Sequence, residues 1–213
     1  SNHNMIEVSG YSFIGEDSLN RLRINEDREL RLSNPLSTEQ DRLRRTLVPF
    51  IVSSIRYNSR FHDDFSIFEL ARVYLKKDRA SGDLAEERTM VTGAVYCKKA
   101  GPPLFYDAKQ IAAGLMQKLR VADWELVPER EVTLPYVHPG RAMTLMVDKK
   151  PAGRVFELHP ESLAAFDITG TAALFDIEVD LLYNARRLDS AFSELQKYPD
   201  VPFEVSVLAD RQA

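Results

Sequence analysis

The sequence is poor in cysteine and has no long apolar run. Its one cysteine, Cys97, excludes an internal disulfide and any metal site built from several thiolates, and we expect it to be a small strand residue. No stretch of 18 apolar residues predicts a transmembrane helix, and residues 1–5 lack the basic and apolar regions of a secretory signal. This composition is typical of a cytoplasmic protein, and we interpret residues 1–4 as a tag remnant or disordered segment.

Excess positive charge is also missing. The 213 residues include 28 basic and 32 acidic side chains, which gives a net charge of −4 and no general attraction for polyphosphate. The chain has no P-loop and no Gly-x-Gly-x-x-Gly motif. Any contact with RNA must therefore be local or shared with a partner.

Strand-like and helix-like segments are mixed without regular alternation, which favours an α+β fold with an antiparallel mixed sheet flanked by helices. One domain is expected over residues 5–200. Residues 201–213 are interpreted as the start of a following truncated or divergent domain, because a new strand begins there. The expected strands span residues 6–13, 29–32, 65–75, 89–96, 124–127, 142–147, 153–158 and 173–179, and short helices span 17–22, 160–166 and 189–197.

A capping box predicts a helix from Ser37, whose hydroxyl and Gln40 can satisfy each other's backbone donors, through Leu47. Pro49 then predicts either a kink or a new helix. This region contains a basic set, Arg42, Arg44 and Arg45, and an apolar pair four residues apart, Ile51 and Ile55. The arginines form either a solvated face or a contact with RNA or a partner, and the isoleucines form either core or a surface that a partner covers.

A second capping signal at Asp107 predicts a helix that buries Ile111, Leu115 and Leu119 on one face. Before it, residues 76–88 are charged and predict a hairpin turn or loop. Both features fit helices packed on a meander of strands.

Histidines and acidic residues offer few sites for chemistry. His62, Asp63 and Asp64 would suit a metal-dependent phosphohydrolase. A solvated turn is the simpler interpretation, because the sequence offers no clear set of further metal ligands. His138 and His159 stand beside prolines and are expected to fix turns through backbone hydrogen bonds, although an acid–base or metal role with a third partner is open.

Arg141 and Arg154 are expected either to face RNA phosphates or an acidic patch on a partner, or to form a structural ion pair with Glu157 or a neighbour. Gly140 with Arg141 is the candidate for a nucleotide-binding arginine turn. It leads into a strand-like run rather than a helix, so ATP catalysis by this chain is not expected.

An ordered set of short motifs resembles the phenylalanyl-tRNA synthetase β chain. Each motif is weak alone, but their order over roughly residues 6–200 is specific. The motifs are Tyr11-Ser12-Phe13, Asn34-Pro35-Leu36-Ser37, Leu43-Arg44-Arg45-Thr46-Leu47-Val48-Pro49, Phe68-Glu69-Leu70-Ala71-Arg72-Val73-Tyr74, Tyr106-Asp107-Ala108-Lys109, His138-Pro139-Gly140-Arg141 and Glu157-Leu158-His159-Pro160.

The resemblance implies a class II synthetase-like domain that does not adenylate. The family's β chain pairs with an α subunit, which holds phenylalanine and uses ATP and Mg²⁺, and tRNA(Phe) is bound through the tetramer of two α and two β subunits. No catalytic, cofactor or metal residue is therefore expected in this chain. The candidates for partner or tRNA contact are Arg42, Arg44, Arg45, Ile51, Ile55, Arg60 and Arg141.

Departures from the family pattern keep other functions open. Ala71 and Gln110 stand where the family has glycine, and Phe203-Glu204 replaces an expected Arg-Asp pair. The main alternative is a stand-alone paralogue that binds a small molecule or RNA. An independent hydrolase built on His62 is the third possibility.

Overall fold

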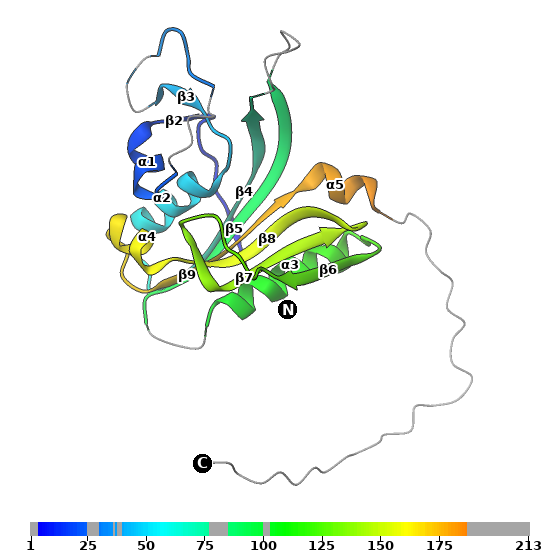
Figure 1. Cartoon of the computed structure of the whole chain (residues 1–213). Coiled ribbons are helices and arrows are strands. Elements are labelled where there is room, and N and C mark those ends of the chain that lie inside the picture. Colours follow the sequence, from blue (N-terminus) through cyan, green and yellow to red (C-terminus); the bar gives the residue numbers. More distant parts are fainter. Residues whose placement is uncertain are drawn as a thin grey trace, which may run out of the picture.

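The computed structural model describes residues 4–24, 30–35, 37, 40–76, 85–99 and 103–186. Within them, a seven-stranded sheet in the order β1-β4-β5-β9-β8-β7-β6 forms the centre of the molecule, and β2 and β3 form a small second sheet (Figure 1). β1 is parallel to β4, and the other neighbours are antiparallel. The expected α+β fold with a mixed, mainly antiparallel sheet is confirmed.

The strands that carry the sheet follow the predicted apolar segments closely. The long hairpin of β4 and β5 pairs continuously from Asp64 and Cys97 to Leu75 and Glu86. The strands are β1 Ile6–Glu7, β2 Phe13–Ile14, β3 Arg42–Leu43, β4 Asp64–Leu75, β5 Glu86–Cys97, β6 Trp124–Pro128, β7 Val137–Val147, β8 Lys150–Leu158 and β9 Thr171–Glu178.

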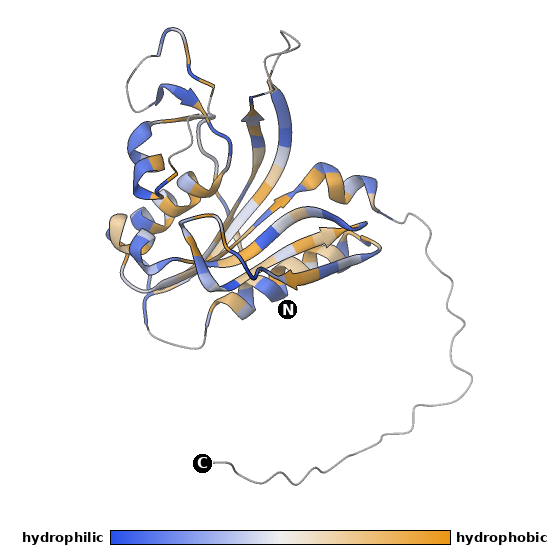
Figure 2. Ribbon diagram, viewed as in Figure 1, coloured by the Kyte–Doolittle hydropathy of each residue, from blue (hydrophilic) through white to orange (hydrophobic). Residues whose placement is uncertain are grey.

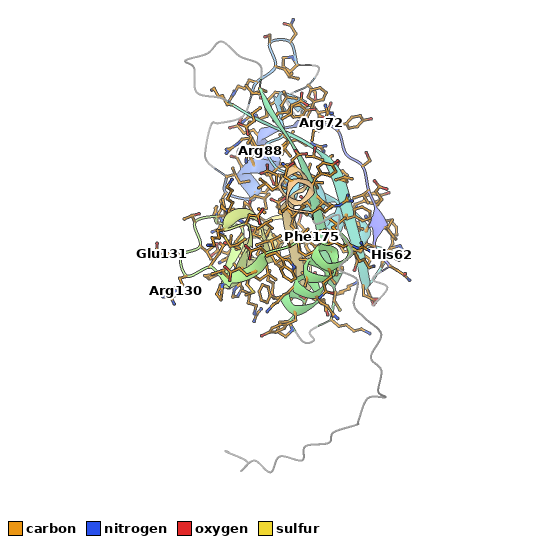
Figure 3. All side chains as sticks on the ribbon, turned by 90° about the vertical axis from the view of Figure 1, so that its right-hand side faces the viewer. His62, Arg72, Arg88, Arg130, Glu131 and Phe175 are labelled. Atoms are coloured by element: carbon orange, nitrogen blue, oxygen red, sulfur yellow. The ribbon has the colours of Figure 1, made fainter. Side chains whose placement is uncertain are left out.

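Helices cover both faces of the sheet. α1, α2 and α4 lie on one face together with β2 and β3, and α3 lies on the other face with α5 nearby (Figures 1 and 3). In the described residues no helix is both long and apolar enough to cross a membrane. The helices are α1 Glu16–Arg21, α2 Val48–Asn58, α3 Phe105–Lys118, α4 Pro160–Ala165 and α5 Val179–Asn184.

The central strand β9 is apolar on both sides because both faces of the sheet are covered. Ala172 and Leu174 pack toward α2 and α4, whereas Ala173 and Phe175 pack toward α3. Phe175 lies between the sheet and α3 (Figure 3), and Gly93 on β5 leaves the space for its ring. The hydropathy colouring shows the apolar sides of the helices turned toward the strands (Figure 2).

The prediction of a helix from Ser37 to Leu47 is wrong. Arg42 and Leu43 form β3 instead, which pairs with Ile14 and Phe13 of β2. Long-range pairing overrides the local capping signal here. The helix α2 begins at Val48, so Pro49 lies in its first turn, where a missing N–H costs nothing.

The helix expected near Asp107 exists, but it begins two residues earlier and no side chain caps it. Its buried residues are Phe105, Ala108, Ala112 and Met116, whereas the expected stripe Ile111, Leu115 and Leu119 is only partly buried. The helix is therefore rotated relative to the prediction, because small alanines allow closer approach to the sheet.

Several shorter predictions also need correction. Residues 6–13 form parts of two strands rather than one, and Val179, expected in a strand, begins α5. Residues 30–32 form an isolated bridge from Arg31 to Arg42 rather than a strand. The expected helix over 189–197, the start of a domain at 201–213 and most of the loop at 76–88 lie outside the described residues.

Candidate functional site

The candidate nucleotide-binding turn lies within a strand. Gly140 and Arg141 are part of β7, and the register between β7 and β8 shifts between Val137 and Ala142. The backbone N–H of Gly140 donates to His138 Nδ1 at 3.0 Å. Arg141 forms an ion pair with the nearly buried Glu157 on β8. This arginine is thus oriented by a carboxylate rather than presented to a triphosphate from a strand-to-helix turn.

The second expected structural arginine is also paired. Arg154 on β8 lies 3.7 Å from the carboxylate of Glu129, and the Thr144 hydroxyl donates a hydrogen bond to Glu129 Oε1 at 2.9 Å. The interpretation of Arg141 and Arg154 as structural ion pairs is confirmed.

Arg154 belongs to a polar row that the sequence analysis missed. The row crosses five strands in register, through Glu69, Thr92, Asp176, Arg154 and Thr144. The Thr92 hydroxyl donates to Asp176 Oδ1 at 2.6 Å, and burial raises the pKa of the Asp176 carboxyl. Each of these residues lies on a different strand, so no local spacing in the sequence could reveal the row.

Arg42 and Arg44 are buried rather than on a helix surface. Arg42 donates to Asp41 at 2.8 and 3.0 Å and lies 3.4 Å from Glu16. The two donations of Arg42 hold the pKa of the Asp41 carboxyl below its ordinary value. Arg44 lies 2.9 Å from Glu69, and both side chains are at least 95% buried. Both arginines are committed to contacts inside the chain.

Arg45 is half-buried and lines a cavity of about 570 Å³. Thr46, Pro49, Leu134 and Tyr136 also line it. Burial raises the pKa of the Tyr136 hydroxyl still further above neutral pH. The cavity is therefore mainly apolar, with two arginines, Arg23 and Arg45, and a phenol in its wall.

Ile51 and Ile55 are fully buried in the core beneath α2. Core packing, one of the two open interpretations, therefore describes them. The outer surface of this region instead presents Tyr57 and Phe61, which are 64% and 68% exposed with ring centroids 5.8 Å apart. Their four-residue spacing is visible in the sequence, but spacing alone does not show which of two apolar sets is buried.

His138 and His159 each accept a backbone hydrogen bond that fixes a local turn. His159 Nδ1 accepts the backbone N–H of Glu161 at 3.2 Å at the start of α4, and His138 fixes Gly140 in the same way. Both expected backbone bonds are confirmed. His62, Asp63 and Asp64 are exposed at the turn between α2 and β4, and across the described ranges no three His, Cys, Asp or Glu side chains gather as metal ligands would.

Comparison with known proteins agrees with the fold and the motifs. The β subunits of phenylalanine–tRNA ligase from Solibacter usitatus and Moorella thermoacetica are 28% and 31% identical to the chain, over 95% and 96% of its length. The chain spans about a quarter of the length of these curated relatives, 25% and 26% respectively.

The similarity of this chain to a solved structure concerns the fold only. The pyrrolysyl-tRNA synthetase of Desulfitobacterium hafniense superimposes with a TM-score of 0.66 at 19% identity, over 84% of this chain and 61% of that one. The fold is therefore that of a class II synthetase core. Because the family described as the phenylalanyl tRNA synthetase beta chain CLM domain matches residues 2–179, the chain belongs to that family.

Proposed function

We propose that this chain is a non-catalytic, synthetase-like module of a phenylalanine–tRNA ligase β subunit, which supports an α subunit and helps to position tRNA(Phe) in the cytoplasm. In this proposal, the α subunit holds phenylalanine and uses ATP and Mg²⁺. The observation that carries it is the place of Gly140 and Arg141 inside β7, within a chain of this family.

The chemistry explains why that place matters. Attack of a carboxylate on the α-phosphate of ATP requires fixed positive charge around the triphosphate. Here Glu157 and Glu129 accompany Arg141 and Arg154. The two pairs lie on opposite faces of the sheet, because Glu157 is opposite Ala173 whereas Arg154 is opposite Asp176. No single face therefore presents both arginines to a triphosphate, and each arginine already has a carboxylate beside it.

The aromatic pair at the C-terminal end of α2, with Tyr57 on the helix and Phe61 in the turn after it, supports a partner. Tyr57 and Phe61 form an exposed aromatic surface beside a helix whose inner side is fully buried. Exposed aromatic residues of this kind are enriched in protein interfaces, where they bury much area at little entropic cost. We assign this surface, the Tyr57–Phe61 pair, to the α subunit.

Association with the cognate α subunit tests the proposal. The chain and the complete β polypeptide are each mixed with the α subunit and analysed by size-exclusion chromatography with light scattering. Co-elution of the complete polypeptide, and its loss when Tyr57 and Phe61 are both replaced by serine, is expected. If neither protein associates with the α subunit, or if the double variant associates as well as the parent, the proposal is wrong.

The cavity beside Arg45 and Tyr136 favours a second candidate, a stand-alone module that binds a small molecule or RNA. A parent reading frame that ends near Ala213 and lacks upstream metal-binding and editing domains would support this candidate over the first.

A further inference from the structure

A hollow of about 220 Å³ lies where α1 and α2 meet. Three arginines line it, Arg21 from α1, Arg56 from α2 and Arg60 from the turn that follows α2. The chain as a whole carries a net charge of −4, so this gathering of positive charge is local.

Arg21 is held in place by the chain. Its Nε donates to Asp17 Oδ2 at 2.8 Å and its Nη1 donates to the carbonyl oxygen of Ala165 at 3.2 Å. The guanidinium also lies over the Phe166 ring, 5.6 Å from the centroid. A guanidinium has five N–H donors, so three N–H bonds of Arg21 remain available in a fixed orientation.

Arg56 is held from one end. Its Nη2 donates to Asp167 Oδ2 at 3.1 Å. Its Nε is buried and has no hydrogen-bond partner within the part of the chain that the structure describes. A buried donor without a partner is costly, and a ligand that accepts from it would recover that cost.

Arg60 completes the hollow. Its side chain is exposed, and among the described residues it forms no ion pair. Ser18, Ser53 and Tyr57 also belong to the lining, as does Asp17. The hollow therefore brings three guanidinium groups together with three hydroxyl-bearing residues.

We propose that this hollow, the arginine hollow, binds a phosphate group. A planar carboxylate with two oxygens is satisfied by one guanidinium fork, whereas a tetrahedral phosphate presents oxygens in several directions and suits converging arginines. Asp17 and Asp167 are about three-quarters exposed, and each pairs with one arginine of the hollow. Asp17 itself belongs to the lining, so the two carboxylates reduce the positive charge of the three arginines without cancelling it.

The phosphate group comes either from free phosphate or from an RNA backbone, and the two sources share the chemistry of recognition. Tyr57 borders both this hollow and the surface assigned to the α subunit, so phosphate binding is measured on the chain alone, where the result does not depend on that assembly. A failure of the chain to associate with an α subunit would leave it untouched.

Arginine side-chain NMR tests the site directly. Sodium phosphate is titrated into the ¹⁵N-labelled chain at constant ionic strength, with sodium chloride as the reference salt. We expect a saturable shift of the Arg56 Nε–H signal, because that donor gains an acceptor. Arg60→Gln should weaken phosphate binding roughly tenfold, as expected for one charge-assisted hydrogen bond.

Two further variants complete the design. Arg56→Lys keeps the charge but removes the buried Nε donor, and it should also weaken binding. Arg72→Gln is the control. Arg72 is exposed near the end of β4, whereas His62 lies just before the start of that strand (Figure 3), so phosphate binding should be unchanged. Circular dichroism of each variant confirms that the fold is intact.

A second titration with an oligouridylate separates the two sources. If the oligonucleotide shifts the same arginine signals and competes with phosphate, the source is an RNA backbone. If phosphate binds and the oligonucleotide does not, the source is free phosphate. The proposal is overturned if phosphate shifts the signals no more than chloride does, or if Arg60→Gln binds phosphate as well as the parent chain.

Discussion

The buried ion pair between Arg44 and Glu69 joins the β2–β3 unit to the main sheet. Glu69 Oε1 accepts from Arg44 Nη1 at 2.9 Å and from the backbone N–H of Gly10 at 3.0 Å. Arg44 also donates to the carbonyl oxygens of Tyr11 and Arg72. One side chain thus connects three segments that are far apart in the sequence.

Removing one partner of this pair should be costly. Arg44→Ala leaves the Glu69 carboxylate buried without its cation, and we expect a loss of about 3–5 kcal/mol in the free energy of unfolding. Urea denaturation measures the loss. The double variant with Arg44→Met and Glu69→Leu should recover much of the stability, and Arg60→Gln, at an exposed position, should change it by less than about 0.5 kcal/mol. An Arg44→Ala chain as stable as the parent would show that the pair contributes nothing.

Asp176 should make stability depend on pH. Burial raises the pKa of its carboxyl in the folded state above the ordinary value of 3.8. The folded state therefore binds this proton more tightly, and the stability that it contributes is present below pH 3.8 and is lost as the pH rises through the folded pKa.

Asp176→Asn should remove that dependence while keeping an oxygen for the Thr92 hydroxyl. The variant should gain stability relative to the parent as the pH rises above 3.8, measured by urea denaturation at a series of pH values. Asp167→Asn, at an exposed carboxylate, is the control and should show no such gain. A variant that loses stability at neutral pH would mean that the ionised carboxylate is favourable in the fold.

At the scale of elements, the sequence predicts what local periodicity controls. Long apolar and β-branched runs predict the strands β4, β5, β8 and β9, and four-residue spacing predicts α2 and α3. The helix expected from Ser37 failed because the pairing of Arg42 and Leu43 with β2 is a long-range choice. No spacing within the segment carries that information.

Two glycines in these elements give a pair of predictions with opposite effects on stability. A Cβ at Gly153 on β8 would lie 2.8 Å from the backbone Cα of Ile177, which cannot move without disturbing β9. Gly153→Ala should therefore cost about 1–3 kcal/mol. A Cβ at Gly114 in α3 would meet nothing within 4 Å, so Gly114→Ala should stabilise the chain by about 0.5–1 kcal/mol through helix propensity.

Thermal and urea unfolding of the two alanine variants check this difference in sign. Equal effects of the two substitutions would show that strand packing at β8 and β9 is looser than the structure indicates.

At the scale of the whole molecule, the family and the fold were predictable, but the sites were less so. The motif order identified the family, since it spans most of the chain. The candidate residues divided by burial, which the sequence could not supply: Arg42, Arg44, Ile51 and Ile55 are inside, and Arg60 and Arg141 reach the surface. Sequence spacing places residues on an element, whereas burial depends on what packs against it.

The aromatic surface gives a prediction for the assembly. Replacing Tyr57 and Phe61 individually by serine in the complete β polypeptide should each weaken association with the α subunit, by about tenfold or more for an interface hot spot. Neither residue supports the core, so the stability of the chain should change little. Sedimentation equilibrium measures the association, and Tyr106→Ser, at an exposed tyrosine on α3, is the matched control.

Phenylalanine-dependent exchange of pyrophosphate into ATP tests most directly the claim that this class II core does not adenylate. The assay measures adenylate formation alone, so weak phosphate binding elsewhere on the chain does not disturb it. The purified chain with Mg²⁺, ATP and phenylalanine should give no exchange above a protein-free blank, and exchange should appear with the α subunit and the complete β polypeptide. Exchange catalysed by the chain without any companion would contradict the account.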